Sequence, residues 1–217
     1  KKPAYIVIDR NATMAMPIVD EIEAAHGPEE TIFISEEEAL DMMTQRSLVI
    51  VVDTHSPDFV ESKELLNEAQ RVVVIDHHRM MVKHINNAVV FYHEPYASSA
   101  SEMVSELVQY IGNTVLSKEE ADALLAGIML DTKNFVLKSG VRTFEAAAYL
   151  RRRGADTVVV KKMFASNIDT YKEKYSLIST AEVYNGCAIA CTDESTPNVR
   201  VAAAQAADEL LSIQGVN

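Results

Sequence analysis

Acidic and histidine residues directly follow two short apolar runs in the sequence, SLVIVV and VVVI. The first run leads into Asp53, and the second leads into Asp76, His77 and His78. Carboxylate oxygen and imidazole nitrogen together suit divalent ions such as manganese, iron or zinc. A carboxylate can also bridge two such ions, and neutral imidazole can complete each shell. The residue types therefore predict a metal site, which in turn supports metal-assisted hydrolysis.

Each acidic residue also has an ordinary structural explanation. A single Asp after a strand is more often the N-cap of a helix than a metal ligand. Asp53 together with Asp76, His77 and His78 is harder to explain in that way, because clustered acidic and histidine side chains are costly to hold close without a bound cation. A third candidate, Asp131, follows an apolar helical segment. Taken alone it is a polar helix-end residue, so its case depends on the other two clusters.

The elements that must position these residues alternate along the first half of the chain. Apolar runs at 5–8, 31–34, 47–52 and 72–75 are typical of strands, and stretches with helical spacing separate them. This alternation predicts an α/β fold, a doubly wound parallel β-sheet flanked by helices. The β-branched run 47–52 predicts a central strand covered on both faces. Such sheets bind ligands beyond the carboxyl ends of their strands, where both clusters fall.

The second half of the chain is predicted to be mostly helical. Apolar residues recur every three or four positions at 101–111, 118–130 and 143–153. Further on, one long helix or two shorter ones precede a strand at 183–191 and an Ala-rich helix at 201–211. These elements predict a first α/β domain at 1–155, a helical connector at 156–181 and the start of a second α/β domain at 182–217.

Composition limits the class of protein. The 217 residues carry a formal net charge of −12, which argues against general nucleic-acid binding through a basic surface. A small anionic substrate remains compatible, because bound metal ions reverse the local field. No apolar run reaches the roughly 20 residues that span a bilayer, and no signal segment precedes the first strand, so we expect a soluble fragment without membrane contact. Cys187 and Cys191 are expected to be reduced core residues.

Several segments resemble the DHH phosphoesterases that carry a DHH-associated second domain (DHHA1), and among these the GdpP-type cyclic-di-AMP phosphodiesterases of Gram-positive bacteria. The segments are VIDHHR, EPYASSASEMV, GIMLDTKNF and GVRTFEAAAYLRRRGAD, which lie within residues 50–156. The resemblance implies hydrolysis of cyclic-di-AMP to pApA at two manganese ions. It also implies a cytoplasmic location within a membrane-anchored parent protein, and it is compatible with a homodimer.

The resemblance also implies a role for each candidate residue. Asp53 would bridge the two metal ions, and His77 and Asp131 would complete the shell of the second ion. His78 would lie beside the metals, where it contacts the scissile phosphate or orients a ligand. Asp76 would fix the tautomer of a histidine through a hydrogen bond.

Candidates for substrate contact and the remaining histidines are assigned less directly. Candidate substrate-binding residues are Ser98, Ser99 and Arg142. Arg142 fits equally well as a surface residue before a helix. His55 follows Asp53 closely and lies either near the site or in an unrelated loop. His84 and His93 are expected at the surface or in packing contacts.

The chain departs from the family pattern in two places. Members carry a His-x-x-x-Asp-x-Asp motif after their first strand, whereas Asp9 ends a strand here without a companion His or second Asp. The glycine-rich GGGH segment of the family's second domain is also absent from the 217 residues. We therefore predict that this polypeptide keeps one side of a dinuclear site, binds metal weakly and turns over little substrate.

Three other functions are compatible with the same residues. The site could act on short oligonucleotides or adenosine bisphosphate, as in nanoRNase-type relatives. A catalytically inactive module could bind nucleotide or a partner without cleaving it. An inorganic pyrophosphatase shares the DHH signature, but the segment around Asp131 is more similar to the GdpP-type enzymes.

Overall fold

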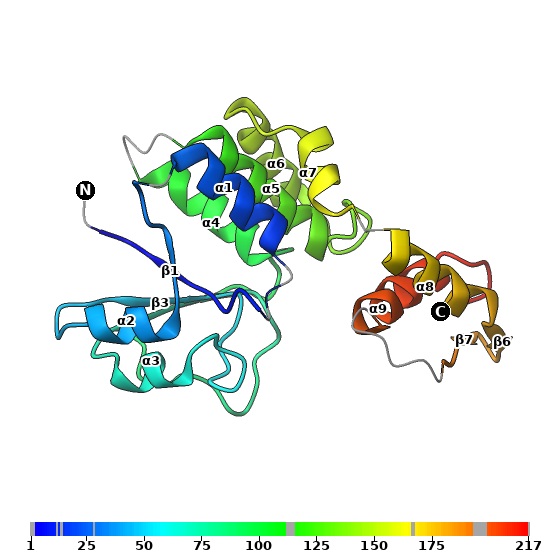
Figure 1. Cartoon of the computed structure of the whole chain (residues 1–217), viewed down its shortest axis with the longest axis horizontal. Coiled ribbons are helices and arrows are strands. Elements are labelled where there is room, and N and C mark those ends of the chain that lie inside the picture. Colours follow the sequence, from blue (N-terminus) through cyan, green and yellow to red (C-terminus); the bar gives the residue numbers. More distant parts are fainter. Residues whose placement is uncertain are drawn as a thin grey trace. The chain divides into compact units, whose positions relative to one another are not determined.

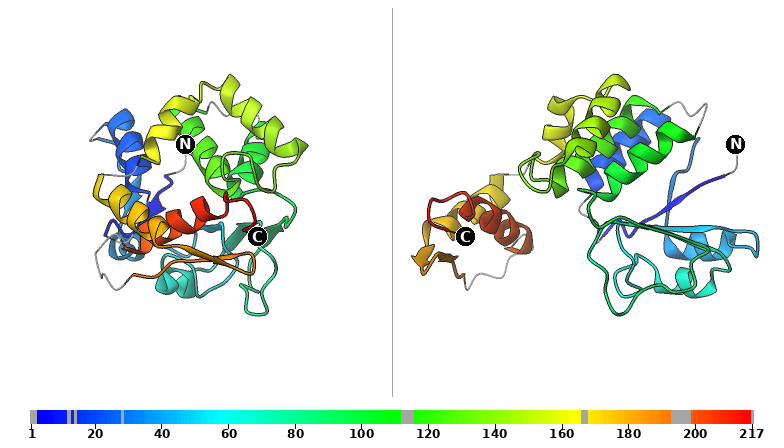
Figure 2. Two further views of the ribbon diagram at one scale, coloured as in Figure 1. Left: turned by 90° about the vertical axis from the view of Figure 1, so that its right-hand side faces the viewer. Right: turned by 180° about the vertical axis from the view of Figure 1, so that it is seen from behind.

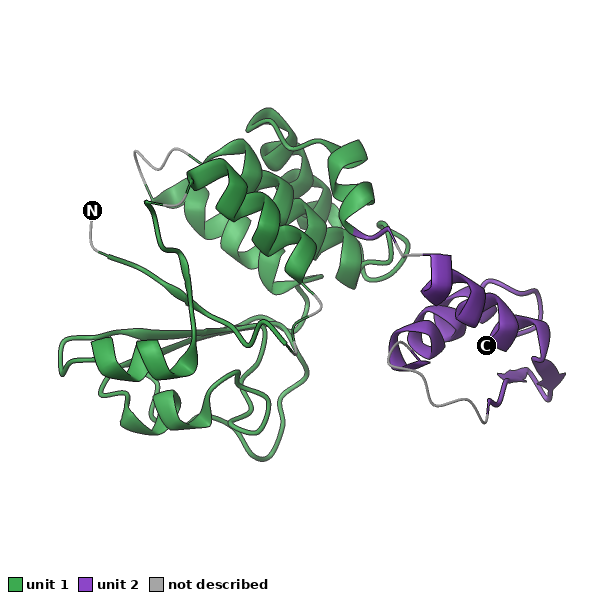
Figure 3. Ribbon diagram, in the orientation of Figure 1, with its two compact units in different colours: residues 1–163 green, residues 164–217 purple. Residues whose placement is uncertain are grey.

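The chain folds into two units, residues 1–163 and residues 164–217 (Figure 3). The computed structural model describes residues 3–11, 13, 15–27, 29–111, 116–165, 168–192 and 199–216. The predicted connector, residues 156–181, spans the division between the two units. It contains two helices, one in each unit, rather than one long helix.

A parallel sheet in the first unit carries the candidate site at the carboxyl ends of its strands. Its strands are β3 (Val49–Val52), β4 (Val72–Asp76) and β5 (Val90–His93), with β4 in the middle. The register pairs Val52 with Ile75, so β3 and β4 end side by side. The predicted α/β architecture, with parallel strands flanked by helices, is confirmed. Because the strands are parallel, the residues that follow them meet at one edge of the sheet.

Strand β3 lies at the edge of this sheet, so the prediction of a central strand covered on both faces is wrong. Ile50 and Val52 expose 55% and 52% of their surface, whereas Val74 on β4 is fully buried. A separate parallel pair, β1 (Ile6–Val7) and β2 (Phe33–Ile34), does not extend the sheet. The β-branched run therefore predicted the strand correctly, but strand order depends on pairing between distant segments.

Helices surround the strands of the first unit. They are α1 (Met16–His26), α2 (Glu36–Met42), α3 (Lys63–Glu68), α4 (Ala100–Tyr110), α5 (Lys118–Asp131), α6 (Val141–Arg152) and α7 (Thr157–Met163). Figures 1 and 2 show α1 and α4–α7 as one helical group, with α2 and α3 on the other side of the strands.

Helix α5 forms the centre of the helical group. It begins at a capping box between Ser117 and Glu120. Its Leu125 and Ile128 are buried with Leu150 of α6 and Val160 of α7 in one apolar cluster. Packing on several sides fixes the axis of α5, and therefore the position of its last residue, which belongs to the candidate site.

The second unit is small and separately packed. It contains α8 (Ile168–Ser179), β6 (Glu182–Tyr184), β7 (Cys187–Ile189) and α9 (Val199–Leu210). The strand predicted at 183–191 is instead an antiparallel hairpin. It turns at Asn185-Gly186, both at positive φ, a sequence typical of tight hairpin turns. Cys187 and Cys191 are free thiols as predicted, but they are exposed rather than in the core. None of the described helices is long and apolar enough to cross a membrane.

Candidate metal centre

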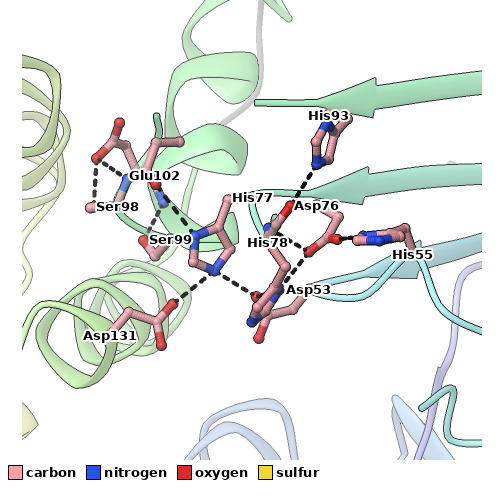
Figure 4. A network of polar contacts seen from close by, with 11 residues as sticks. Asp53, His55, Asp76, His77, His78, His93, Ser98, Ser99, Glu102 and Asp131 are labelled. Carbon is pink, nitrogen blue, oxygen red and sulfur yellow. Dashed lines mark hydrogen bonds and ion pairs between the residues drawn. The ribbon is translucent and has the colours of Figure 1, made fainter. Parts of the chain in front are cut away.

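Asp53 follows β3 in a strained backbone conformation. Its φ is +63°, in the left-handed region that side-chain-bearing residues seldom occupy. Its N–H donates to the carbonyl of Ile75 at 2.9 Å, which continues the β3–β4 pairing one residue beyond the strand. The carboxylate lies beside the residues that follow β4 (Figure 4). Strain of this kind persists where the surrounding structure imposes it, and it clusters at functional sites.

His77 is buried with one ring nitrogen directed at two carboxylates. Its Nδ1–H donates to the carbonyl of Ala97 at 3.3 Å, which leaves a lone pair on Nε2. Nε2 lies 3.2 Å from Asp53 Oδ1 and 3.4 Å from Asp131 Oδ2, yet it makes no hydrogen bond to any described residue. A lone pair facing two negative groups is unfavourable unless a proton or a metal ion lies between them. Accordingly, Asp53 raises the pKa of His77 above its ordinary value.

Asp131 comes from the opposite side of the site, at the end of α5. Thr132 beside it is buried, and its hydroxyl donates to the carbonyl of Ile128 at 2.6 Å and accepts from the Phe135 N–H at 2.9 Å. These bonds close the helix directly after Asp131. Burial raises the pKa of the Asp131 carboxyl, and the negative charge of Asp53 raises it further. A bound cation would relieve this crowding of like charge.

Asp76 and His78 form a hydrogen-bonded pair beside these three residues. The Asp76 carboxylate is fully buried and accepts from His78 Nδ1–H at 2.8 Å and from His55 Nδ1–H. Burial raises the pKa of Asp76, but the hydrogen bonds from His55 and His78 outweigh this effect and hold the pKa below its ordinary value. His78 Nε2 is thereby left with its lone pair. Ligand atoms of Asp53, His77 and His78 lie within 4.8 Å of one another.

These side chains fit one divalent ion. Asp53, His77 and Asp131 supply carboxylate oxygen and imidazole nitrogen, and His77 Nε2, which faces both carboxylates without a hydrogen bond to a described residue, is the atom that a metal would satisfy. His55, Asp76 and His93 form a second close group, also within 4.8 Å. In that group, however, His55 and Asp76 bond to each other, and His93 Nε2–H donates to the His78 carbonyl at 2.6 Å. The second group therefore supports the site rather than forming another.

The predicted substrate-binding residues lie near the loop that carries Ala97, but their polar atoms have partners within the protein. Ser98 is buried and its hydroxyl donates to Glu102 at 2.6 Å, while Ser99 caps α4 through the Glu102 N–H at 3.0 Å. Arg142 donates two hydrogen bonds to Glu106, at 2.8 and 2.7 Å. Substrate contact by these residues stays a prediction.

Two histidines with no firm sequence assignment lie beside the candidate site. His55 is 1% exposed and contacts Asp76 from the side away from His78 (Figure 4). His93 donates a hydrogen bond to the backbone carbonyl of His78. His93 makes packing contacts, as expected, with the backbone of His78 and the ring of His55, and these contacts lie beside the candidate site. A signal existed in the strand register, which pairs Asp76 with His93 across β4 and β5.

The comparison with known proteins agrees with this geometry. Residues 5–128, a stretch that includes Asp53 and the triplet 76–78, match the N-terminal domain of the DHH family. The chain belongs to the DHH family. Membership explains why Asp76, His77 and His78 follow one another, since DHH phosphoesterases are metal-dependent and this triplet borders the candidate metal centre.

Similar DHH proteins are longer than this chain. It is 42% identical over 217 residues to the cyclic-di-AMP phosphodiesterase PdeA of Listeria monocytogenes, covering 98% of this chain and 33% of the relative. It is 48% identical over 185 residues to the cyclic-di-AMP phosphodiesterase GdpP of Geobacillus thermodenitrificans, covering 84% of this chain and 28% of the relative. The chain thus spans about a third of the length of the curated relatives it matches.

A solved structure shares the fold. An exopolyphosphatase-related protein from Bacteroides fragilis matches with a TM-score of 0.73 at 18% identity, over 98% of this chain and 73% of that protein. At this level of identity the likeness concerns the fold alone.

Proposed function

We propose that this chain belongs to a metal-dependent phosphodiesterase that hydrolyses cyclic-di-AMP to pApA. The observation that carries the metal centre is the buried His77 Nε2, which faces Asp53 and Asp131 without a hydrogen bond to any described residue. The substrate class is supported by the two relatives named cyclic-di-AMP phosphodiesterases, which are 42% and 48% identical. From the family resemblance of the sequence we also propose a cytoplasmic segment within a membrane-anchored parent.

Each residue of the centre has a distinct role in this proposal. Asp53, His77 and Asp131 bind the ion, for which we propose manganese because of the mixed nitrogen and oxygen donors and the family resemblance. The ion would supply a nucleophile from water at neutral pH and offset charge on the phosphate. His78 lies beside these ligands, with its Nδ1 4.0 Å from Asp53 Oδ1, and in the neutral ring its Nε2 keeps a lone pair that can accept a proton. Asp76 holds the ring proton of His78 at Nδ1.

We further propose that this polypeptide binds one ion well, although two are expected in the intact enzyme. A second shell would need ligands from the stretch after β1, whose sequence DRNATMAM contains one acidic residue, Asp9. Asp9 is exposed, and its carboxylate accepts from the Asn11 N–H at 2.9 Å. The described residues therefore supply ligands for one ion and too few for a second, and we expect slow turnover.

Manganese-dependent hydrolysis of cyclic-di-AMP by the 217-residue chain tests the proposal. Formation of pApA is followed by chromatography, and bound manganese is counted by elemental analysis. We expect slow hydrolysis that EDTA abolishes, with about one ion per chain. Asp53→Ala should remove both the ion and the activity, whereas His84→Ala, which alters an exposed histidine, should change neither.

Different results would contradict different parts of the proposal. Fast turnover with two ions per chain would refute the proposal that this polypeptide binds one ion well. Equal manganese content in Asp53→Ala and His84→Ala would refute the assignment of Asp53 as a ligand. Faster hydrolysis of pApA than of cyclic-di-AMP would favour the nanoRNase-type activity.

The incomplete ligand set also favours a second candidate, a module that binds the nucleotide without cleaving it. Calorimetry with cyclic-di-AMP separates the two candidates. A binding module should keep its nucleotide affinity after the metal is removed, whereas the phosphodiesterase should lose most of it.

A further inference from the structure

We propose that His55 is a positioning residue that acts through Asp76 to keep the proton of His78 on Nδ1. The functional meaning of this arrangement, which leaves His78 Nε2 as an acceptor beside the metal centre, rests on the function proposed above. The hydrogen-bond arrangement itself follows from described residues and does not depend on a bound ion.

The backbone fixes the tautomer of His55. The ring is 1% exposed, and both of its nitrogens have partners. Nε2 lies 2.9 Å from the N–H of Met81. A backbone amide can only donate, so Nε2 must accept and the ring proton must be on Nδ1. Nδ1–H then donates to Asp76 Oδ2.

Asp76 links His55 to His78 through its two carboxylate oxygens. The carboxylate is fully buried, and its two oxygens have different donors: Oδ2 accepts from His55, and Oδ1 accepts from His78 Nδ1–H at 2.8 Å. An ionised carboxylate cannot donate, so His78 must carry a proton on Nδ1, and in the neutral ring Nε2 is then the acceptor. The His78 N–H also lies 3.3 Å from Oδ1, which holds the backbone against the same oxygen.

Loss of His55 would remove the donor to Asp76 Oδ2. Oδ2 of Asp76 would then be a buried acceptor without a donor, a state that favours rotation of the carboxyl group away from its present position. A rotated carboxylate would no longer accept from His78 Nδ1–H, so the hydrogen bond that holds the ring proton on Nδ1 would be lost.

The surroundings of His55 show why a histidine occupies this buried position. Its carbonyl accepts from the Ile85 N–H at 2.9 Å, so the segment from Met81 to Ile85 is tied to His55 at both ends. His93 stacks edge-on to the His55 ring at 5.5 Å between centroids and holds the His78 carbonyl. A ring with one donor and one acceptor at opposite ends satisfies this environment, whereas an aliphatic side chain would leave both partners unpaired.

Nitrogen-15 NMR of the imidazole rings in the metal-free 217-residue chain tests the proposal. The nitrogen shifts distinguish a protonated from an unprotonated ring nitrogen. We expect His78 as the Nδ1–H tautomer in the wild type, and a mixture or the Nε2–H tautomer in His55→Leu. His55→Asn retains an amide donor near the position of Nδ1 and should keep His78 largely as Nδ1–H. His84→Leu is the matched control and should leave His78 unchanged.

Manganese affinity measured by calorimetry gives a second readout. We expect it to fall about tenfold in His55→Leu and less in His55→Asn, the usual effect of removing an outer hydrogen-bond partner. His78 remaining wholly Nδ1–H in folded His55→Leu would overturn the proposal. If His55→Leu does not fold, a folded His55→Asn chain with His78 as Nε2–H would overturn it equally. Failure of the wild type to hydrolyse cyclic-di-AMP would count against the proposed function but leaves the tautomer result intact.

Discussion

Asp53 allows backbone strain and metal binding to be changed separately at one position. With a φ of +63°, a residue that has a side chain costs about 1–2 kcal/mol, whereas glycine is almost free of this strain. Asp53→Ala keeps the strain and removes the carboxylate, and Asp53→Gly removes both. Glycine also loses about 0.4–1 kcal/mol through the greater freedom of its unfolded chain. We therefore expect metal-free Asp53→Gly to be more stable than Asp53→Ala by about 0.5–1 kcal/mol.

Urea denaturation of the metal-free variants measures this difference, and thermal unfolding with and without Mn²⁺ measures the ligand role. At a hundredfold excess over Kd, a bound ion should stabilise the wild type by about 2.7 kcal/mol. Both Asp53 variants should lose most of this gain, and His84→Ala should keep it. Equal stability of the Ala and Gly variants would refute the left-handed conformation. An undiminished response to Mn²⁺ in either variant would refute Asp53 as a ligand.

Two further predictions concern a buried carboxylate and the effect of pH. Glu102→Ala should lower the free energy of unfolding by about 3 kcal/mol, because unsatisfied buried donors cost about 1–3 kcal/mol each. Glu102 Oε2 accepts from the Ser98 N–H at 3.2 Å, the Ser98 hydroxyl at 2.6 Å and the Thr143 hydroxyl at 2.7 Å. Urea denaturation measures the loss, and a value below about 1 kcal/mol would contradict this role. The rise in Tm caused by Mn²⁺ should be larger at pH 8 than at pH 6. Asp53 raises the pKa of His77 and burial raises the pKa of Asp131, so protons compete with the ion as the pH falls. Without metal, these two raised pKa values contribute stability at low pH that is lost as the pH rises through them. Scanning fluorimetry at both pH values checks this, and a pH-independent shift would exclude these residues as ligands.

The residues that gather at the candidate centre were predictable because local sequence determines where their elements end. The β-branched run of β4 leads into Asp76 and His77, and the capped apolar helix α5 ends at Asp131. Parallel strands end at a common edge, so Asp53 after β3 was expected near them. Each of these inferences needs only the element type and its direction.

Other features depend on contacts between distant segments, which local patterns do not contain. The exposure of Ile50 on β3 follows from the separate pairing of β1 with β2. The positions of His55 and His93 follow from the strand register and from the return of the chain at Met81. The turn at Asn185 is different, because its Asn-Gly sequence is a local signal for a hairpin. The alternating apolar residues on both sides of it predicted one continuous strand instead.

The contacts of Arg142 have a consequence for the order in which ligands bind. Its guanidinium makes two hydrogen bonds to Glu106, lies 3.7 Å from Glu94 and 4.0 Å from Glu102, and belongs to a chain of net charge −12. If Arg142 contacts the dinucleotide of the proposed function, the two negative phosphates meet an arginine whose charge is already offset. Its association should be slow before the ion is bound, and slowest at low ionic strength, where repulsion is least screened. Thermodynamic reciprocity then requires that the nucleotide raise the affinity for the ion by the same factor by which the ion raises the affinity for the nucleotide.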